Sequence, residues 1–173
     1  MSAITGTPVP ETGGNGPHWD EICSWRGRCM NLYARGDEII AETLMVAEAA
    51  GHPVDLTLPP HEQLGILRDL AEAGMTTEDR DAGKRSNTVK AIDAWSKLGA
   101  RRPFVVGGVV TALMQNRERW HARFDSMIGE GDSLKVDQWV ADKIEAEAFE
   151  EILDAAYTLL SIELEQFQNG FGV

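Results

Sequence analysis

The sequence predicts an all-α protein, a helical bundle with long first and last helices, and leaves open a small β-hairpin insertion around residues 108–127. Two observations predict the bundle: apolar residues recur at spacings of three and four from Trp19 to Ala47, and again from about Asp142 to Gln168. A third observation indicates the hairpin. The intervening segment from Phe104 onward is rich in β-branched residues and does not continue the helical spacing of apolar residues.

The first helix is expected to begin near Trp19 and to end at Gly51, where His52 and Pro53 follow. About thirty residues at 1.5 Å rise each give a helix roughly 45 Å long. Its apolar stripe comprises Trp19, Ile22, Trp25, Cys29, Leu32, Gly36 and Ile39, continued by Ile40, Leu44 and Ala47. Residues 1–17 have no apolar period and many Gly and Pro residues, so they are expected to form a flexible tail before a single domain at residues 18–173.

Two shorter helices are expected next. Pro59 and Pro60 precede a run of apolar residues that ends at Gly74, and proline before a helix with glycine after it is the usual asymmetry. Ser86 or Asn87 is expected to cap the third helix, which Gly99 ends. The apolar positions of these two helices are Leu64, Leu67, Leu70 and Ala71, then Val89, Ile92, Trp95 and Leu98.

The segment from Phe104 to Met114 is consistent either with a buried helix broken by glycine or with a short strand. The next segment alternates, with Trp120, Ala122, Phe124 and Ser126 at even positions and polar residues between them, which favours an amphipathic strand. The last helix is expected to bury one side, formed by Phe149, Ile152, Leu153, Ala156, Leu159, Leu160, Leu164 and Phe167. Its Glu147, Glu150, Glu151 and Asp154 are interpreted as a solvated acidic face rather than a metal site.

Composition limits the function classes. The chain has 173 residues, 43% of them hydrophobic, with 28 acidic and 16 basic side chains and a net charge of -12. This is globular composition, and the charge argues against a surface that binds nucleic acid throughout. The longest uncharged stretch, Pro103 to Asn116, is too short to cross a bilayer, and the N-terminus lacks a secretory signal. We therefore expect a cytoplasmic protein without membrane contact.

Metal and cofactor signals are absent from the sequence. Cys23 and Cys29 lie about 240° apart on a helix, so they are expected to be unpaired core residues. There is no Cys-x-x-Cys, and Glu118-x-x-His121 occurs without the second copy that a di-iron bundle needs. Phosphate-loop, serine-hydrolase and dinucleotide motifs are also missing. The sequence predicts no metal site, no cofactor and no catalytic residue.

The segment Arg102-Pro103-Phe104-Val105-Val106-Gly107-Gly108 carries a family resemblance. With the order of elements around it, the chain resembles the HEPN superfamily of helical-bundle proteins, whose third helix region carries Arg-Asn-x-x-x-His-Gly. Arg102 matches the arginine and Gly108 the glycine, whereas Pro103 replaces the asparagine and Gly107 the histidine. Catalytic members are metal-independent ribonucleases that use the histidine in acid/base chemistry. The resemblance therefore implies a non-catalytic relative, and it implies a homodimer.

Charge is unevenly distributed along the chain. Residues 1–79 carry a net charge of -9, residues 80–123 carry +7 and residues 124–173 carry -10. Either the basic segment is neutralised by the acidic helices, or it forms an anion-binding strip beside Trp120 for RNA, a nucleotide or an acidic partner. The candidate residues of this strip are Arg101, Arg102, Arg117, Arg119, His121 and Arg123.

Three functional hypotheses follow. The leading one is a non-enzymatic HEPN-like protein that acts through protein–protein interaction as a homodimer. The alternative is a toxin-type ribonuclease or nucleic-acid-binding protein that uses the basic strip, with His121 as its acid/base. The third is a bundle that binds a small molecule near Trp95, Phe104 and Trp120.

Overall fold

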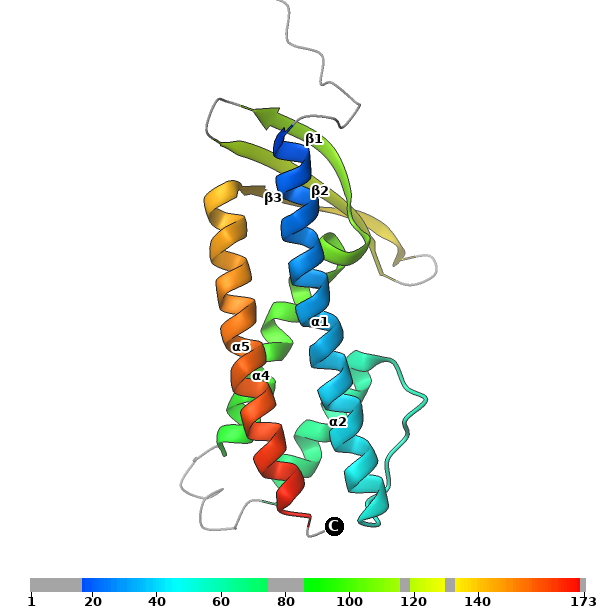
Figure 1. The fold of residues 1–173 in the computed structure, drawn as a ribbon. Helices are drawn as coiled ribbons and strands as arrows, with labels where there is room; N and C mark the ends of the chain where they lie inside the picture. Colours follow the sequence, from blue (N-terminus) through cyan, green and yellow to red (C-terminus); the bar gives the residue numbers. More distant parts are fainter. Residues whose placement is uncertain (1–16, 75–85, 116–118, 130–132, 172–173) are drawn as a thin grey trace, which may run out of the picture.

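A computed structural model describes residues 17–74, 86–115, 119–129 and 133–171. The two long helices, α1 (Pro17–Ala49) and α5 (Lys143–Asn169), run parallel and side by side, with their N-terminal ends near the sheet (Figure 1). The helix α4 (Asn87–Leu98) runs in the opposite direction, and α2 (Pro60–Ala73) lies beside the C-terminal half of α1. The expected tail, residues 1–17, lies outside the described residues apart from Pro17, which begins α1.

Two helix starts are fixed by side-chain caps. Ser86, one of the two expected caps of α4, accepts a hydrogen bond from the backbone N–H of Val89 at 3.1 Å. At the start of α5, Asp142 and Glu145 form a reciprocal capping box, in which each side chain accepts a hydrogen bond from the other residue's backbone N–H. Because Asp142 is also the last residue of a strand, the capping box makes the chain turn directly from the sheet into α5.

The all-α prediction is wrong, because a three-stranded antiparallel sheet lies at one end of the helices. Its strands are β1 (Val109–Gln115), β2 (Trp120–Ile128) and β3 (Lys135–Asp142), in the order β1-β2-β3. The chain therefore has a mixed helix and sheet fold. A 3-10 turn η1 (Gly99–Arg101) and a π-helical turn η2 (Pro103–Gly107) connect α4 to β1, so the segment from Phe104 contains both a helical turn and a strand.

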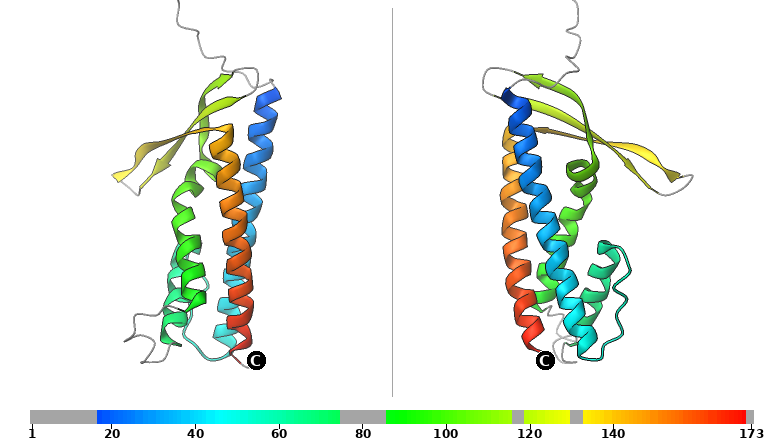
Figure 2. Two further views of the ribbon diagram at one scale, coloured as in Figure 1. Left: turned by 90° about the vertical axis from the view of Figure 1, so that its left-hand side faces the viewer. Right: turned by 45° about the vertical axis from the view of Figure 1, so that its right-hand side comes forward.

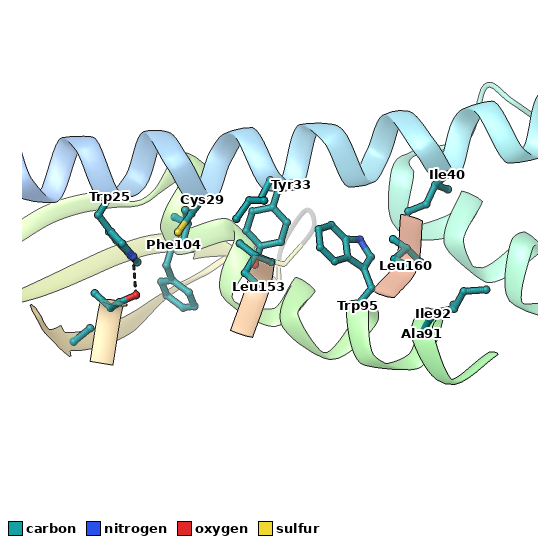
Figure 3. Close-up of a cluster of buried hydrophobic side chains, with 14 of the residues drawn as sticks. Trp25, Cys29, Tyr33, Ile40, Ala91, Ile92, Trp95, Phe104, Leu153 and Leu160 are labelled. Carbon is teal, nitrogen blue, oxygen red and sulfur yellow. Dashed lines mark hydrogen bonds between the residues drawn. The ribbon is translucent and has the colours of Figure 1, made fainter. Parts of the chain in front are cut away.

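The sheet covers the N-terminal ends of α1 and α5, and the β2–β3 hairpin extends beyond the helices (Figure 2). The expected alternation of β2 is confirmed: Trp120, Ala122, Phe124 and Ser126 are buried, and the residues between them are more exposed. Under this inner face Trp25 of α1 contacts the rings of Trp120, Phe124 and Trp139 at centroid distances of 5.6 to 6.3 Å. Its indole N–H donates to the carbonyl of Ala146 at 2.8 Å, which ties α1 and the sheet to α5 (Figure 3).

A second group of aromatic residues joins the helices farther from the sheet. Trp95 of α4 lies beside Tyr33 of α1 (Figure 3). The Trp95 ring also contacts Tyr157 on α5, and the Tyr33 hydroxyl donates to the Leu98 carbonyl at 2.7 Å. The Trp95 indole lies directly against the backbone of Gly36, where a Cβ atom would be 2.1 Å from the ring. Glycine at this position therefore lets α4 approach α1.

Two expectations about burial need correction. The last helix does not bury one continuous apolar side: Leu153, Leu160 and Leu164 are buried, whereas Ile152 and Leu159 are exposed. Both cysteines are free, as expected, but Cys23 is exposed and only Cys29 is in the core. Cys23 follows the buried Ile22 by one residue, which rotates it about 100° away from the core face of α1.

The two thiols are expected to differ in reactivity. Burial raises the pKa of the Cys29 thiol to about 12, so the reactive thiolate is scarce at about pH 8. With a disulfide reagent at that pH, we expect the folded protein to titrate one thiol quickly, Cys23, and the unfolded protein to titrate two. Cys23→Ser should abolish the fast reaction; fast labelling that persists in this variant would show that Cys29 is accessible.

Candidate functional site

The five described residues of the predicted basic strip lie on different parts of the fold. Arg101 and Arg102 belong to the turns between α4 and the sheet, whereas Arg119 directly precedes β2 and is exposed. His121 and Arg123 are in β2. Arg117 lies outside the described residues.

Arg102 is engaged inside the protein. Its guanidinium donates two hydrogen bonds to the carboxylate of Asp37 on α1, one of them at 2.8 Å, and lies 5.4 Å from the centroid of the Tyr33 ring. Its hydrogen bonds to the Asp37 carboxylate raise the pKa of Arg102, whose side chain is only partly exposed. The contact is bidentate, because it uses both carboxylate oxygens of Asp37. Through it, Arg102 links the η1–η2 connection to α1.

Arg101 and the two β2 residues lie on opposite sides of the sheet. The Arg101 guanidinium lies 5.2 Å from the ring centroid of Trp139, which belongs to the inner face together with its register partner Phe124. His121 and Arg123 occupy the outer face, because they alternate with the buried residues of β2. The sheet therefore separates Arg101 from the other two.

On the outer face, Arg123 has local partners. Its Nε–H donates to the Thr111 hydroxyl at 2.8 Å, and the same nitrogen lies 3.2 Å from Asp125. His121 is exposed and pairs in register with Met114 on one side and Asp142 on the other. The structure thus brings His121 and Arg123 together on one strand. Arg102 lies elsewhere, in contact with the Asp37 carboxylate of α1.

The position that resembles the HEPN histidine offers no proton-transfer group. Gly107 ends the η2 turn, and a Cβ atom built there would meet nothing within 4 Å. Gly108, by contrast, lies against the backbone of Phe104, whose carbonyl oxygen would be 2.3 Å from a Cβ atom. The glycine that matches the motif is thus required by close backbone packing, which is a structural role. Among the described residues, no group of three or more His, Cys, Asp or Glu side chains is placed to hold a metal ion.

The three aromatic residues of the small-molecule hypothesis are part of the packed interior. Trp95, Phe104 and Trp120 are all buried. Phe104 contacts the Trp139 ring and Trp120 contacts the Trp25 ring, whereas Trp95 belongs to the separate group formed with Tyr33 and Tyr157. These side chains hold the sheet and the helices together.

The outer face of the sheet carries an apolar surface that the sequence did not indicate. Residues directly opposite each other in an antiparallel sheet share a face, and the register therefore places the partners of His121, Arg123, Asp125 and Met127 on the outer face. Five apolar side chains on it are at least 60% exposed: Val109, Met114, Met127, Val136 and Val140. The outward-facing residues of β2 were predictable, because they occupy the odd positions of an alternating segment. Those of β3 were not, because sequence periodicity did not identify that strand.

No helix within the described ranges combines the length and the apolar character needed to cross a bilayer.

Comparison with known proteins gives no relative: no family model matches the chain, and neither a curated protein nor a solved structure matches it at a significant level.

Proposed function

We propose that the protein acts through protein–protein interaction, as a homodimer joined by the outer faces of two sheets, and not as an enzyme. The observation that carries the proposal is the exposure of Val109, Met114, Met127, Val136 and Val140 on one face of the sheet. Single exposed apolar residues are ordinary, but several on one face are typical of an interaction surface.

Electrostatics favours a second copy as the occupant of this face. Two chains with a net charge of -12 repel each other, so they approach at least cost where the facing surface carries little net charge. On the outer face of β2, Arg123 lies beside Asp125, and the two charges offset each other. In a two-fold dimer the same patch of each subunit faces its copy. A patch of apolar residues that carries both signs of charge can complement itself in this way.

A non-catalytic relationship to HEPN-like proteins remains a proposal. It is supported by Gly107, which provides no acid/base group, and by the contact of Arg102 with Asp37, which uses the arginine inside the fold. The alternative ribonuclease would use Arg101, Arg102 and the basic residues from Arg117 to Arg123, with His121 as its acid/base. The Arg102 side chain contacts Asp37 of α1, whereas His121 lies on the outer face of β2, and nothing in the described arrangement favours their joint action on a substrate.

The homodimer is tested by molar mass from light scattering after size-exclusion chromatography, at a series of protein concentrations. We expect the wild type to approach twice its 19.0 kDa chain mass as concentration rises. The substitution Met127→Glu places a carboxylate in the proposed interface, so it should keep the protein monomeric, because an unpaired charge opposes burial. Met45→Glu on the exposed side of α1 is the matched control and should still dimerise. A wild type that stays monomeric throughout would contradict the proposed dimer.

A further inference from the structure

The helix α5 has a second apolar face that no described element covers. Its buried side contacts α1 and α4 through residues such as Leu153, Leu160 and Leu164. A separate set of exposed apolar residues recurs at spacings of three and four along the same helix. This set, which we call the α5 stripe, consists of Ile144, Ala148, Ile152, Ala155, Leu159 and Ile162.

The α5 stripe forms one continuous band. At 100° per residue its six members fall within about 80° of rotation, and from Ile144 to Ile162 they extend about 27 Å along the helix. The side chains that reach α1 lie on another side: Lys143 bonds Glu21, and Glu150 bonds Arg28. A helix in a globular protein needs only one apolar face for its own packing. The second face takes no part in the packing of the described elements and is exposed.

The charges beside the α5 stripe are all negative. Glu147, Glu151 and Glu165 border it on one side, and Glu145 and Glu163 border it on the other. Glu145 takes part in the capping box, and Glu147 lies 4.0 Å from Lys143. The other three carboxylates have no ion-pair partner among the residues that the structure describes. The single basic residue of α5, Lys143, is engaged with Glu21 and Glu147.

We propose that the α5 stripe docks an amphipathic helix of a different protein, with apolar residues at spacings of three and four and Lys or Arg on both flanks. A second copy of α5 would bring like-charged flanks together, which is unfavourable in helix pairs. Basic flanks would instead pair with Glu151, Glu163 and Glu165 while the apolar residues of the two helices interdigitate. The inference goes beyond the proposed homodimer, which uses the outer face of the sheet.

The dimensions of the α5 stripe define the partner. A band about 27 Å long matches about five turns of helix, or roughly 18 residues. Ala148 and Ala155 alternate with the larger Ile152 and Leu159 along the band, so larger side chains of the docked helix can fit over the alanines. The partner helix therefore presents an apolar seam of this length and a positive charge on each side of it.

The experiment uses the full chain and a fluorescent synthetic peptide of about 20 residues, with Leu at spacings of three and four and Lys at flanking positions. A second peptide keeps the Leu positions and carries Glu at the flanks. By fluorescence anisotropy, we expect the Lys-flanked peptide to bind at least about tenfold more tightly than the Glu-flanked one. The same binding should weaken as NaCl rises from about 50 to 500 mM.

The double substitution Ile152→Gln with Leu159→Gln tests the α5 stripe itself without changing charge. It should weaken binding of the Lys-flanked peptide about tenfold or more, since it removes apolar contact. Met45→Gln is the matched control, because Met45 and Ile152 are equally exposed at 58%, and it should leave binding unchanged. If the peptide bound the wild type and the double variant equally, the binding would reflect general attraction to an acidic protein, and the proposal would be overturned. Loss of dimer mass in the double variant would also overturn it, because the occupant of the α5 stripe would then be a second copy.

The same measurements separate this inference from the homodimer. Met127→Glu should abolish the dimer and leave binding of the Lys-flanked peptide intact, because Met127 lies on the sheet and the stripe lies on α5. Failure of the dimer alone leaves the peptide result unaffected, and failure of peptide binding leaves the dimer unaffected.

Discussion

Replacing Trp25 by alanine is expected to lower the free energy of unfolding by about 3–5 kcal/mol, the usual range for a large buried aromatic residue. The Trp25 ring contacts three aromatic residues of the sheet, and its N–H donates to the carbonyl of Ala146 on α5. Its removal opens the junction at which α1, the sheet and α5 meet. Native domains have about 5–15 kcal/mol of stability in all, so this single substitution removes a large part of it.

Urea denaturation followed by circular dichroism measures this loss, with protein concentration fixed across variants because the proposed dimer would add to apparent stability. Trp25→Phe is the matched comparison. It retains an aromatic ring but removes the hydrogen bond to Ala146, and it should cost clearly less than Trp25→Ala. A loss below about 1 kcal/mol for Trp25→Ala would be typical of a surface residue and would contradict the arrangement described for this junction.

Gly36→Ala is expected to destabilise the protein by about 1–3 kcal/mol, although alanine is the better helix former. The added Cβ atom would lie 2.1 Å from Cζ2 of Trp95, a side chain that is almost fully buried and contacts the rings of Tyr33 and Tyr157. Because this indole is packed against two other rings, it cannot move away without disturbing its neighbours. The clash therefore outweighs the gain in helix propensity.

Gly27→Ala separates the clash from the propensity effect. Gly27 is also inside α1, but a Cβ atom there meets nothing within 4 Å. Alanine at this position should stabilise the fold by about 0.5–1 kcal/mol in the same denaturation experiment. If both variants changed stability in the same direction, Trp95 would not be packed against Gly36 as described.

The helices were predictable because their signal is local. The 3.6-residue period along α1 identified Ile22, Trp25 and Cys29 as core residues, and the Ser86 cap was readable from its position before an apolar run. The strand β3 was not predictable in this way. Its Val136 and Val140 face outward and its Trp139 and Ala141 face inward, so apolar residues fall on both faces and the alternation of a half-buried strand is lost.

The candidate residues were only partly predictable, because their partners are distant in sequence. The segment charges left open whether the basic middle of the chain contacts the acidic helices or forms an anion-binding strip, and Arg102 with Asp37 is a contact of the first kind. These two residues are 65 positions apart, so no local pattern connects them. For the same reason the sequence could not divide the apolar residues of α5 into a buried face and an exposed one. That division depends on where α1 and α4 contact the helix.

The two proposed surfaces should respond in opposite ways to salt. The proposed sheet interface would join two acidic chains through apolar contacts, so screening of their mutual repulsion by added salt should strengthen the dimer. The α5 stripe is proposed to attract a basic helix, so the same salt should weaken docking. The contrast follows from where the charges lie: Arg123 is paired with Asp125 on the sheet, whereas Glu151, Glu163 and Glu165 border the stripe without ion-pair partners among the described residues.

The most direct test of the central claim is methionine oxidation by hydrogen peroxide, read out by mass spectrometry at low and at high protein concentration. Met114 and Met127 lie on the outer face of the sheet, whereas Met30 and Met45 are exposed on α1. If the sheets join two chains, oxidation of Met114 and Met127 should slow markedly at high concentration, while Met30 and Met45 react at unchanged rates. Equal oxidation rates at both concentrations for all four methionines would contradict the account.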